Sequence, residues 1–129
     1  GEPVFNSEGN GASSEIQRAC DFIVSIQKED GSWGEDFQSC VQHTYVEHET
    51  GQVINTAWAL LGLMAANYPN KSVVEKGIQF LNSRIEETGD FPQEGISGVF
   101  NGNVAETYTS YRNVFPLWAM GRFLNEYNR

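Results

Sequence analysis

The chain has 129 residues, of which 40% are hydrophobic and 12% aromatic; this composition excludes a disordered polypeptide and suffices for one modest core. Eight basic and seventeen acidic residues give a formal net charge of -9, which excludes nucleic acid as a partner because its phosphates would be repelled. No run of about 18 apolar residues is present to span a bilayer, so any membrane contact is expected to be peripheral.

The first predicted helix covers residues 14–30. Ser14 and Gln17 have the spacing of a capping box, and the turn at Asp30-Gly31 ends the segment. One face is apolar and the other is charged, which is typical of a helix with one buried side. The residues of the apolar face are Ile16, Ala19, Cys20, Ile23 and Ile26.

The second predicted helix covers residues 53–66 and is apolar almost all round, which is typical of a helix buried on every side. It ends at the turn 67–70, where Pro69 cannot continue the helical hydrogen bonds.

The third predicted helix begins with a second capping box, Ser72 to Glu75, and is again amphipathic. Its apolar face carries Val74, Gly77, Ile78, Leu81 and Ile85. A glycine-rich stretch follows, and then a fourth, apolar helix over residues 114–124. We expect Pro116 in its first turn, where a missing N–H is harmless.

These four helices predict an all-α fold made of α/α hairpin repeats. Residues 18–33 match residues 76–91, so each unit pairs an outer, half-polar helix with an inner, apolar one. The units cover about 13–66 and 72–127, and such hairpins stack into solenoids or closed α/α barrels. Two units leave apolar ends open and the sequence begins with Gly rather than Met, so we expect a piece of a longer chain.

Residues 18–33 resemble the Gln-Trp repeat of the squalene and oxidosqualene cyclases, with Gln27, Gly31 and Trp33 at its constrained positions. The second copy is degenerate, because Ile85 replaces the glutamine and Phe91 the tryptophan, while Gly89 is kept. Further segments resemble the C-terminal end of sterol-forming cyclases: residues 33–40, 55–60, 98–101 and 108–116.

The resemblance implies an enzyme several times longer than this chain, with two α-barrel domains. It implies cyclisation of the triterpene substrate 2,3-oxidosqualene to a sterol precursor such as lanosterol or cycloartenol, without a cofactor. It also implies an intracellular protein in monotopic contact with the endoplasmic reticulum membrane or a lipid droplet. The rest of the cyclase chain is then the main partner of these residues.

By the same resemblance, Phe100 faces the developing carbocation, Tyr108 lines the same cavity, and Asn101 holds the loop that carries Phe100. Aromatic rings suit this role because each stabilises a desolvated cation by roughly 2 kcal/mol without acting as a nucleophile. From spacing alone, an aromatic residue such as Phe100 in a glycine-rich loop is most often an anchor that holds the loop to the core, and Tyr108 is equally a core residue with a satisfied hydroxyl.

The family's acid motif, of the type Asp-Cys-Thr-Ala-Glu, is absent, so no catalytic residue is assigned and the isolated chain is expected to be inactive. Val104 and Glu106 replace a Cys and a branched aliphatic residue of the family pattern. A carboxylate beside the path of the carbocation would act as a premature base if it faced the cavity.

The other polar and aromatic residues are given structural roles. His43 and His48 lack metal-site spacing and are expected in a solvated loop, and no metal site is predicted. Cys20 and Cys40 are expected to be reduced thiols. Trp58 and Trp118 are expected to pack on the inner helices, and residues 111–113 to form a polar cluster that fixes the last one.

Two alternatives remain. A helical-repeat scaffold would reuse cyclase hairpins to bind a hydrophobic partner without catalysis. A function like that of the protein prenyltransferase β-subunit shares only the barrel, and it needs a zinc triad that has no convincing placement here.

Overall fold

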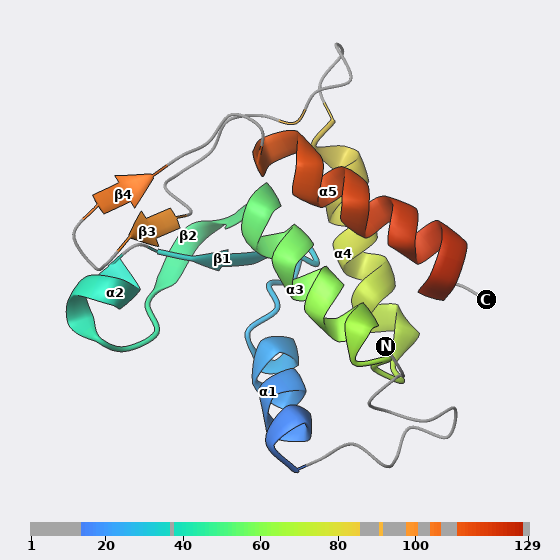
Figure 1. The fold of residues 1–129 in the computed structure, drawn as a ribbon, viewed down its shortest axis with the longest axis horizontal. Coiled ribbons are helices and arrows are strands. Elements are labelled where there is room, and N and C mark those ends of the chain that lie inside the picture. The colour runs from blue at the N-terminus through green and yellow to red at the C-terminus, as the bar shows by residue number, and fades with distance from the viewer. Residues whose placement is uncertain are drawn as a thin grey trace.

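The computed structural model describes residues 14–36, 38–85, 91, 98–100, 104–106 and 111–127. The side chains of residues 98–100, 104–106 and 111–113 lie outside this description. The described part is mostly helical, with two small antiparallel sheets (Figure 1). The helices are α1 (Ser14–Ser25), α2 (Gln38–Gln42), α3 (Val53–Ala65), α4 (Lys71–Ser83) and α5 (Tyr111–Arg122), which continues as a π-helix (Phe123–Tyr127).

The strands correct the expectation of an all-α chain. Strand β1 (Trp33–Glu35) pairs with β2 (Glu47–Gln52), and β3 (Gly98–Phe100) pairs with β4 (Val104–Glu106). Each pair is antiparallel and forms a sheet by itself. Strand β2 leads directly into α3, so the first sheet fixes where the central helix begins.

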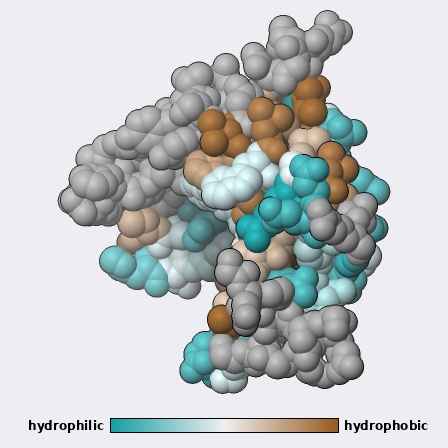
Figure 2. Space-filling model, turned by 45° about the vertical axis from the view of Figure 1, so that its right-hand side comes forward, coloured by the Kyte–Doolittle hydropathy of each residue, from teal (hydrophilic) through white to brown (hydrophobic). Residues whose placement is uncertain are grey.

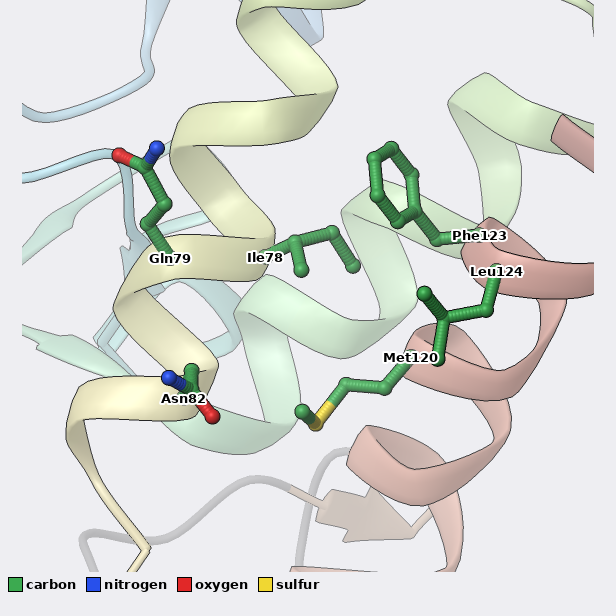
Figure 3. Close-up of a pocket in the computed structure, with 6 residues that line it drawn as sticks. All are labelled: Ile78, Gln79, Asn82, Met120, Phe123 and Leu124. Carbon is green, nitrogen blue, oxygen red and sulfur yellow. The ribbon is translucent and has the colours of Figure 1, made fainter. Parts of the chain in front are cut away.

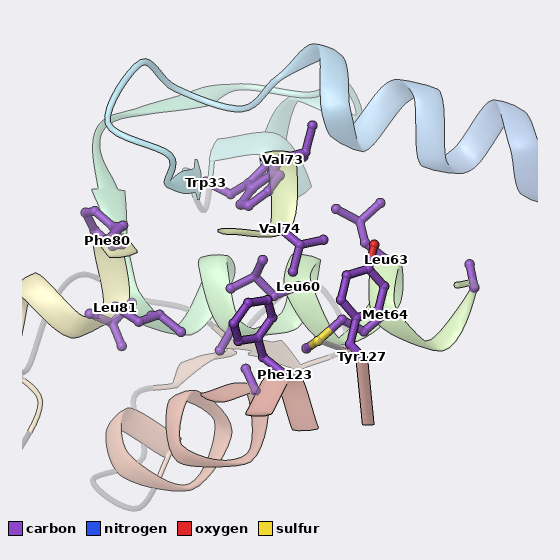
Figure 4. Close-up of a cluster of buried hydrophobic side chains, with 14 of the residues drawn as sticks. Trp33, Leu60, Leu63, Met64, Val73, Val74, Phe80, Leu81, Phe123 and Tyr127 are labelled. Carbon is purple, nitrogen blue, oxygen red and sulfur yellow. The ribbon is translucent and has the colours of Figure 1, made fainter. Parts of the chain in front are cut away.

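Helix α3 is the centre of the core and packs against both α4 and α5 (Figure 1). Leu60, Leu63 and Ala57 are fully buried, and Gly77 of α4 lies so close that a Cβ there would come within 2.6 Å of Leu60. Figure 4 shows the side chains of α3, α4 and the π-helix converging on this centre. Burial of apolar surface between these three helices is therefore the main source of stability in the described part.

The prediction that residues 53–66 are buried on every side is wrong within these residues. Gly62 and Ala65 are exposed, and Trp58 is only half-buried. One side of α3 is open to solvent because α4 and α5 cover only part of its circumference.

The ends of two helices differ from expectation. Helix α1 ends at Ser25, five residues before the predicted turn, because residues 26–31 form turns that close on Ser32. The cap of α4 is Asn70 rather than Ser72, and its side-chain oxygen accepts the backbone N–H of Ser72 at 3.2 Å. Asparagine is among the best N-cap residues, so it displaces the predicted capping box by two positions.

Pro116 lies inside α5 and not in its first turn, because the helix already begins at Tyr111. The proline is fully buried, and its missing N–H leaves the carbonyl of residue 112 without its usual helical donor. Burial of the apolar Pro116 ring offsets part of the stability lost with that hydrogen bond.

Candidate functional site

The first Gln-Trp motif forms a junction between α1, β1 and α4. The half-buried amide of Gln27 donates two hydrogen bonds, one to the carbonyl of Gly31 at 3.1 Å and one to the carbonyl of Val73 in α4 at 2.9 Å. One side chain therefore closes its own turn and ties that turn to a helix 46 residues away.

Gly31 is required at this junction for two independent reasons. Its φ angle is 90°, a conformation that L side chains rarely adopt, and a Cβ atom would lie 2.3 Å from the carbonyl oxygen of Lys76. The backbone of the turn thus touches the backbone of α4, and a glycine alone permits that approach.

Trp33 is 3% exposed and is held at both its ring and its backbone. The indole N–H donates to the carbonyl of Ile23 in the last turn of α1 at 2.7 Å, and the same carbonyl accepts the backbone N–H of Ile26 at 3.3 Å. Its backbone N–H donates to the hydroxyl of Thr56 at 2.9 Å, and that hydroxyl lies 3.3 Å from the carbonyl of Trp33. Strand β1 is therefore fixed to both α1 and α3.

Thr56 is a residue that sequence reasoning missed. It is completely buried in α3, where a hydroxyl needs a partner. The only signal for it was a single hydroxyl residue among apolar neighbours in the predicted second helix.

The second Gln-Trp motif is only partly described. Phe91 is 1% exposed and belongs to the core, and Ile85 follows α4 with 37% of its surface exposed. Gly89 lies outside the described residues. At the position of Gln27 the second motif thus presents an apolar side chain that has no amide to donate.

The predicted cavity residues are described only in part. Phe100 lies in strand β3, where the register pairs it with Val104, so it is not in a loop as expected; Gly98 pairs with Glu106. Asn101 and Tyr108 lie outside the described residues, as do the side chains of Phe100, Val104, Glu106 and residues 111–113. Their roles as cavity residues or as a polar cluster remain predictions.

Three aromatic rings from α3 and α5 meet where these two helices pack together. Trp58 contacts Phe115 edge to face, with ring centroids 5.5 Å apart, and Phe115 stacks on Trp118 at 6.3 Å. Trp118 thus packs on Phe115 of its own helix, but 55% of its surface is exposed. Aromatic pairs of this geometry contribute about 0.5–1.5 kcal/mol beyond their buried area.

A groove of about 290 Å³ runs between α4 and the end of α5 (Figure 3). Met120, Phe123 and Leu124 line one wall and Ile78 the other, with the amides of Gln79 and Asn82 beside it. The lining is mainly apolar and carries no titratable group, so the groove suits apolar contact rather than acid–base chemistry.

The π-helix at the end of α5 is tied to the turn between α3 and α4. The hydroxyl of Tyr127 donates to the carbonyl of Tyr68, and the ammonium group of Lys71 lies 5.7 Å from the centre of the Tyr127 ring. Burial, together with the neighbouring Tyr68 and Glu75, raises the pKa of Tyr127 to about 12.

The histidines and cysteines take ordinary structural positions. His43 is exposed in a turn, whereas His48 lies half-buried in β2 rather than in a loop, and its Nδ1 accepts the backbone N–H of Thr50 at 3.2 Å. Cys20 and Cys40 are free thiols, and burial raises the pKa of Cys20. Across the described ranges, no three His, Cys, Asp or Glu side chains are grouped as ligands for a metal ion.

None of the helices in the described ranges combines the length and the apolar character needed to cross a bilayer.

Comparison with known proteins decides the family. The family model of the squalene-hopene cyclase C-terminal domain matches residues 5–125. The chain belongs to this family. It is 53% identical over 116 residues to the lanosterol synthase of Mus musculus, and 49% identical over 116 residues to that of Homo sapiens. Over 90 residues it is 56% identical to the cycloartenol synthase of Dictyostelium discoideum.

These matches cover most of this chain and a small part of each relative. The two lanosterol synthases match over 90% of the chain, and the cycloartenol synthase over 70%. The chain spans 16% of the length of the lanosterol synthases and 13% of that of the cycloartenol synthase.

Proposed function

We propose that the intact protein containing these 129 residues is an oxidosqualene cyclase. It converts 2,3-oxidosqualene to a sterol precursor, and these residues form a C-terminal section of an α/α barrel built from hairpin units. The observation that carries this proposal is the identity of 49–56% to lanosterol and cycloartenol synthases over 70–90% of the chain.

The proposed reaction is an isomerisation in which an acid protonates the epoxide and a carbocation then moves along the folded polyene. The cavity must exclude water and hold positive charge without offering a base until the last step. No protein cofactor is required by this chemistry. The acid motif is absent from this chain, so the acid comes from another part of the intact protein, and the 129 residues alone are inactive.

The proposed contribution of this section is the wall of the cavity. Phe100 presents its ring to the cation, Tyr108 lines the same space, and Asn101 holds the turn of the β3–β4 hairpin. The junction at Gln27, Gly31 and Trp33 supports the proposal indirectly, since it fixes outer helices to inner ones and so keeps such a wall rigid.

A substrate as apolar as oxidosqualene is held in membranes, so we propose that the intact enzyme contacts one leaflet of the endoplasmic reticulum or a lipid droplet in monotopic fashion. The relatives include both lanosterol and cycloartenol synthases, and the product of this protein is accordingly one of these two classes.

The test is to incubate the purified intact protein, and separately the 129-residue chain, with 2,3-oxidosqualene and to follow consumption of the substrate. The proposal expects turnover by the intact protein and none by the chain. Binding of oxidosqualene by the intact protein without any turnover would instead support a non-catalytic helical scaffold.

A further inference from the structure

Helix α3 begins without the side-chain cap that most helices have. Gln52 is its N-cap residue and makes no capping hydrogen bond with its side chain. The first N–H groups of a helix have no carbonyl partner within it, and the N-cap side chain normally accepts the N–H of the second or third helical residue. In α3 these residues are Ile54 and Asn55. Their backbone N–H groups therefore need an acceptor from outside the helix.

The side chains of Gln52 and Asn55 have the opposite need. Hydrophilic residues are common on the face of the molecule drawn in Figure 2, where solvent can bond to them. Gln52 is instead only 2% exposed, and its Oε1 atom and the Oδ1 atom of Asn55 are both buried. Among the described residues, neither oxygen has a hydrogen-bond donor. Because buried polar atoms in folded proteins are nearly always paired, each of these oxygens needs a donor.

The hydroxyl groups beside this junction are already engaged. Ser32 packs against the backbone of Gly51, so closely that a Cβ atom there would overlap its hydroxyl group, and this hydroxyl donates to the carboxylate of Asp30. The hydroxyl of Thr56 accepts the backbone N–H of Trp33 and donates to the carbonyl of the same residue at 3.3 Å. Neither hydroxyl is therefore left to donate to the two amide oxygens.

The combination of groups selects a small neutral ligand. The N–H dipoles at the start of a helix disfavour a cation, and the amide oxygens of Gln52 and Asn55 disfavour an anion. The N-cap and the third helical residue are the two positions of a capping box, so their side chains flank the same N–H groups. Since Oε1 of Gln52 is already enclosed by this chain, its donor has to be small enough to be enclosed with it. Water has the required size and supplies both donors and acceptors.

We propose that the start of α3 is the binding site of a buried water molecule. The water accepts the backbone N–H of Ile54 or Asn55 and donates to Oε1 of Gln52 and Oδ1 of Asn55. It replaces the missing side-chain cap and fixes the point where β2 passes into α3. The proposal is independent of the cyclisation reaction, and no turnover is needed to test it.

The first experiment measures thermal unfolding of the intact protein with Gln52→Met or Asn55→Leu, which each remove one oxygen and keep a side chain of similar size. We expect each substitution to lower Tm by about 1 °C or more, because the N–H group and the remaining oxygen lose the water that joins them. Without a bound water, each substitution would remove an unpaired buried oxygen and raise Tm. Gln42→Met is the matched control, since Gln42 is exposed in α2, and it should leave Tm unchanged. A Tm that is raised or unchanged in either test variant would overturn the proposal.

The second experiment needs no variant. In a crystal structure of the intact protein at a resolution that shows ordered water, we expect isolated density at about 2.7–3.2 Å from Oε1 of Gln52, from Oδ1 of Asn55 and from the backbone nitrogen of Ile54 or Asn55. A donor side chain in this position, or clear density for the surrounding residues with none between them, would also overturn the proposal.

Discussion

The side-chain amide of Gln27 and the backbone carbonyl of Val73 are joined by a hydrogen bond of 2.9 Å, although the residues lie 46 positions apart. This bond connects the turn after α1 to α4. The Gln-Trp motif therefore acts here as a structural joint, and its individual contacts can be removed one at a time.

Replacing Gln27 by Leu removes both hydrogen bonds of the amide while keeping a side chain of similar size. We expect the free energy of unfolding to fall by about 1–3 kcal/mol, because two carbonyls lose a donor in a half-buried place. Urea unfolding measures the change. Gln42→Leu is the control, since Gln42 is exposed, and it should change stability by no more than about 0.5 kcal/mol. Equal effects of the two substitutions would refute the structural role of the amide.

Gly31→Ala and Gly62→Ala are expected to change the free energy of unfolding in opposite directions. At Gly31 the added methyl group meets a carbonyl oxygen at 2.3 Å and the φ angle is 90°, so we expect a loss of more than about 1 kcal/mol. Gly62 lies within α3, and no atom comes within 4 Å of the position that an added methyl group would take, so alanine should stabilise the chain by about 0.5–1 kcal/mol. Thermal unfolding of the two variants measures these changes. If both variants gained stability or both lost it, the geometry described at Gly31 would be contradicted.

Thr56→Val keeps the shape of the side chain and removes the hydroxyl that accepts the backbone N–H of Trp33. We expect the free energy of unfolding to fall by about 1–3 kcal/mol, because the buried backbone N–H of Trp33 is left without a partner. Thr56→Ser retains the hydroxyl and should recover most of that loss. Hydrogen exchange at the amide of Trp33 reports the contact directly, and unchanged protection in Thr56→Val would show that the bond is unimportant.

The stability of the chain should fall at alkaline pH through Tyr127. Its pKa in the folded chain is about 12, above the ordinary tyrosine value of 10.0, so the folded state retains a proton that the unfolded state loses. The resulting stabilisation is complete below about pH 10 and is lost as the pH rises through about 12. Tyr127→Phe should lower stability at neutral pH and make the decline between these values shallower. Urea unfolding at several pH values measures the decline in stability. If Tyr127→Phe lost stability with pH as steeply as the unchanged chain, Tyr127 would be excluded as the cause.

Much of the helical structure follows from the sequence pattern. The bounds predicted for the second helix, 53–66, agree with α3 to within one residue, because a long apolar segment and Pro69 define both its length and its end. The third helix begins within one residue of its predicted start, even though its cap is Asn70.

The sheets and the details of the junction did not follow from the sequence. Strand β2 reads Glu-His-Glu-Thr-Gly-Gln and has no alternating apolar pattern, so nothing local distinguishes it from a loop. Its pairing with β1 depends on Trp33, which is fixed by contacts with Ile23 and Thr56 that are distant in sequence. The start of α5 at Tyr111 was not predicted, because Pro116 is normally found in the first turn of a helix and so indicated a later start.

The most direct test of the proposed function is the identity of the product formed by the intact protein from 2,3-oxidosqualene, analysed by gas chromatography and mass spectrometry. Cyclisation rearranges bonds without adding or removing atoms. The account therefore predicts a new compound with the mass of the substrate and the retention time of lanosterol or cycloartenol. Recovery of unchanged substrate from a folded intact protein, or of a product with a different mass, would contradict it.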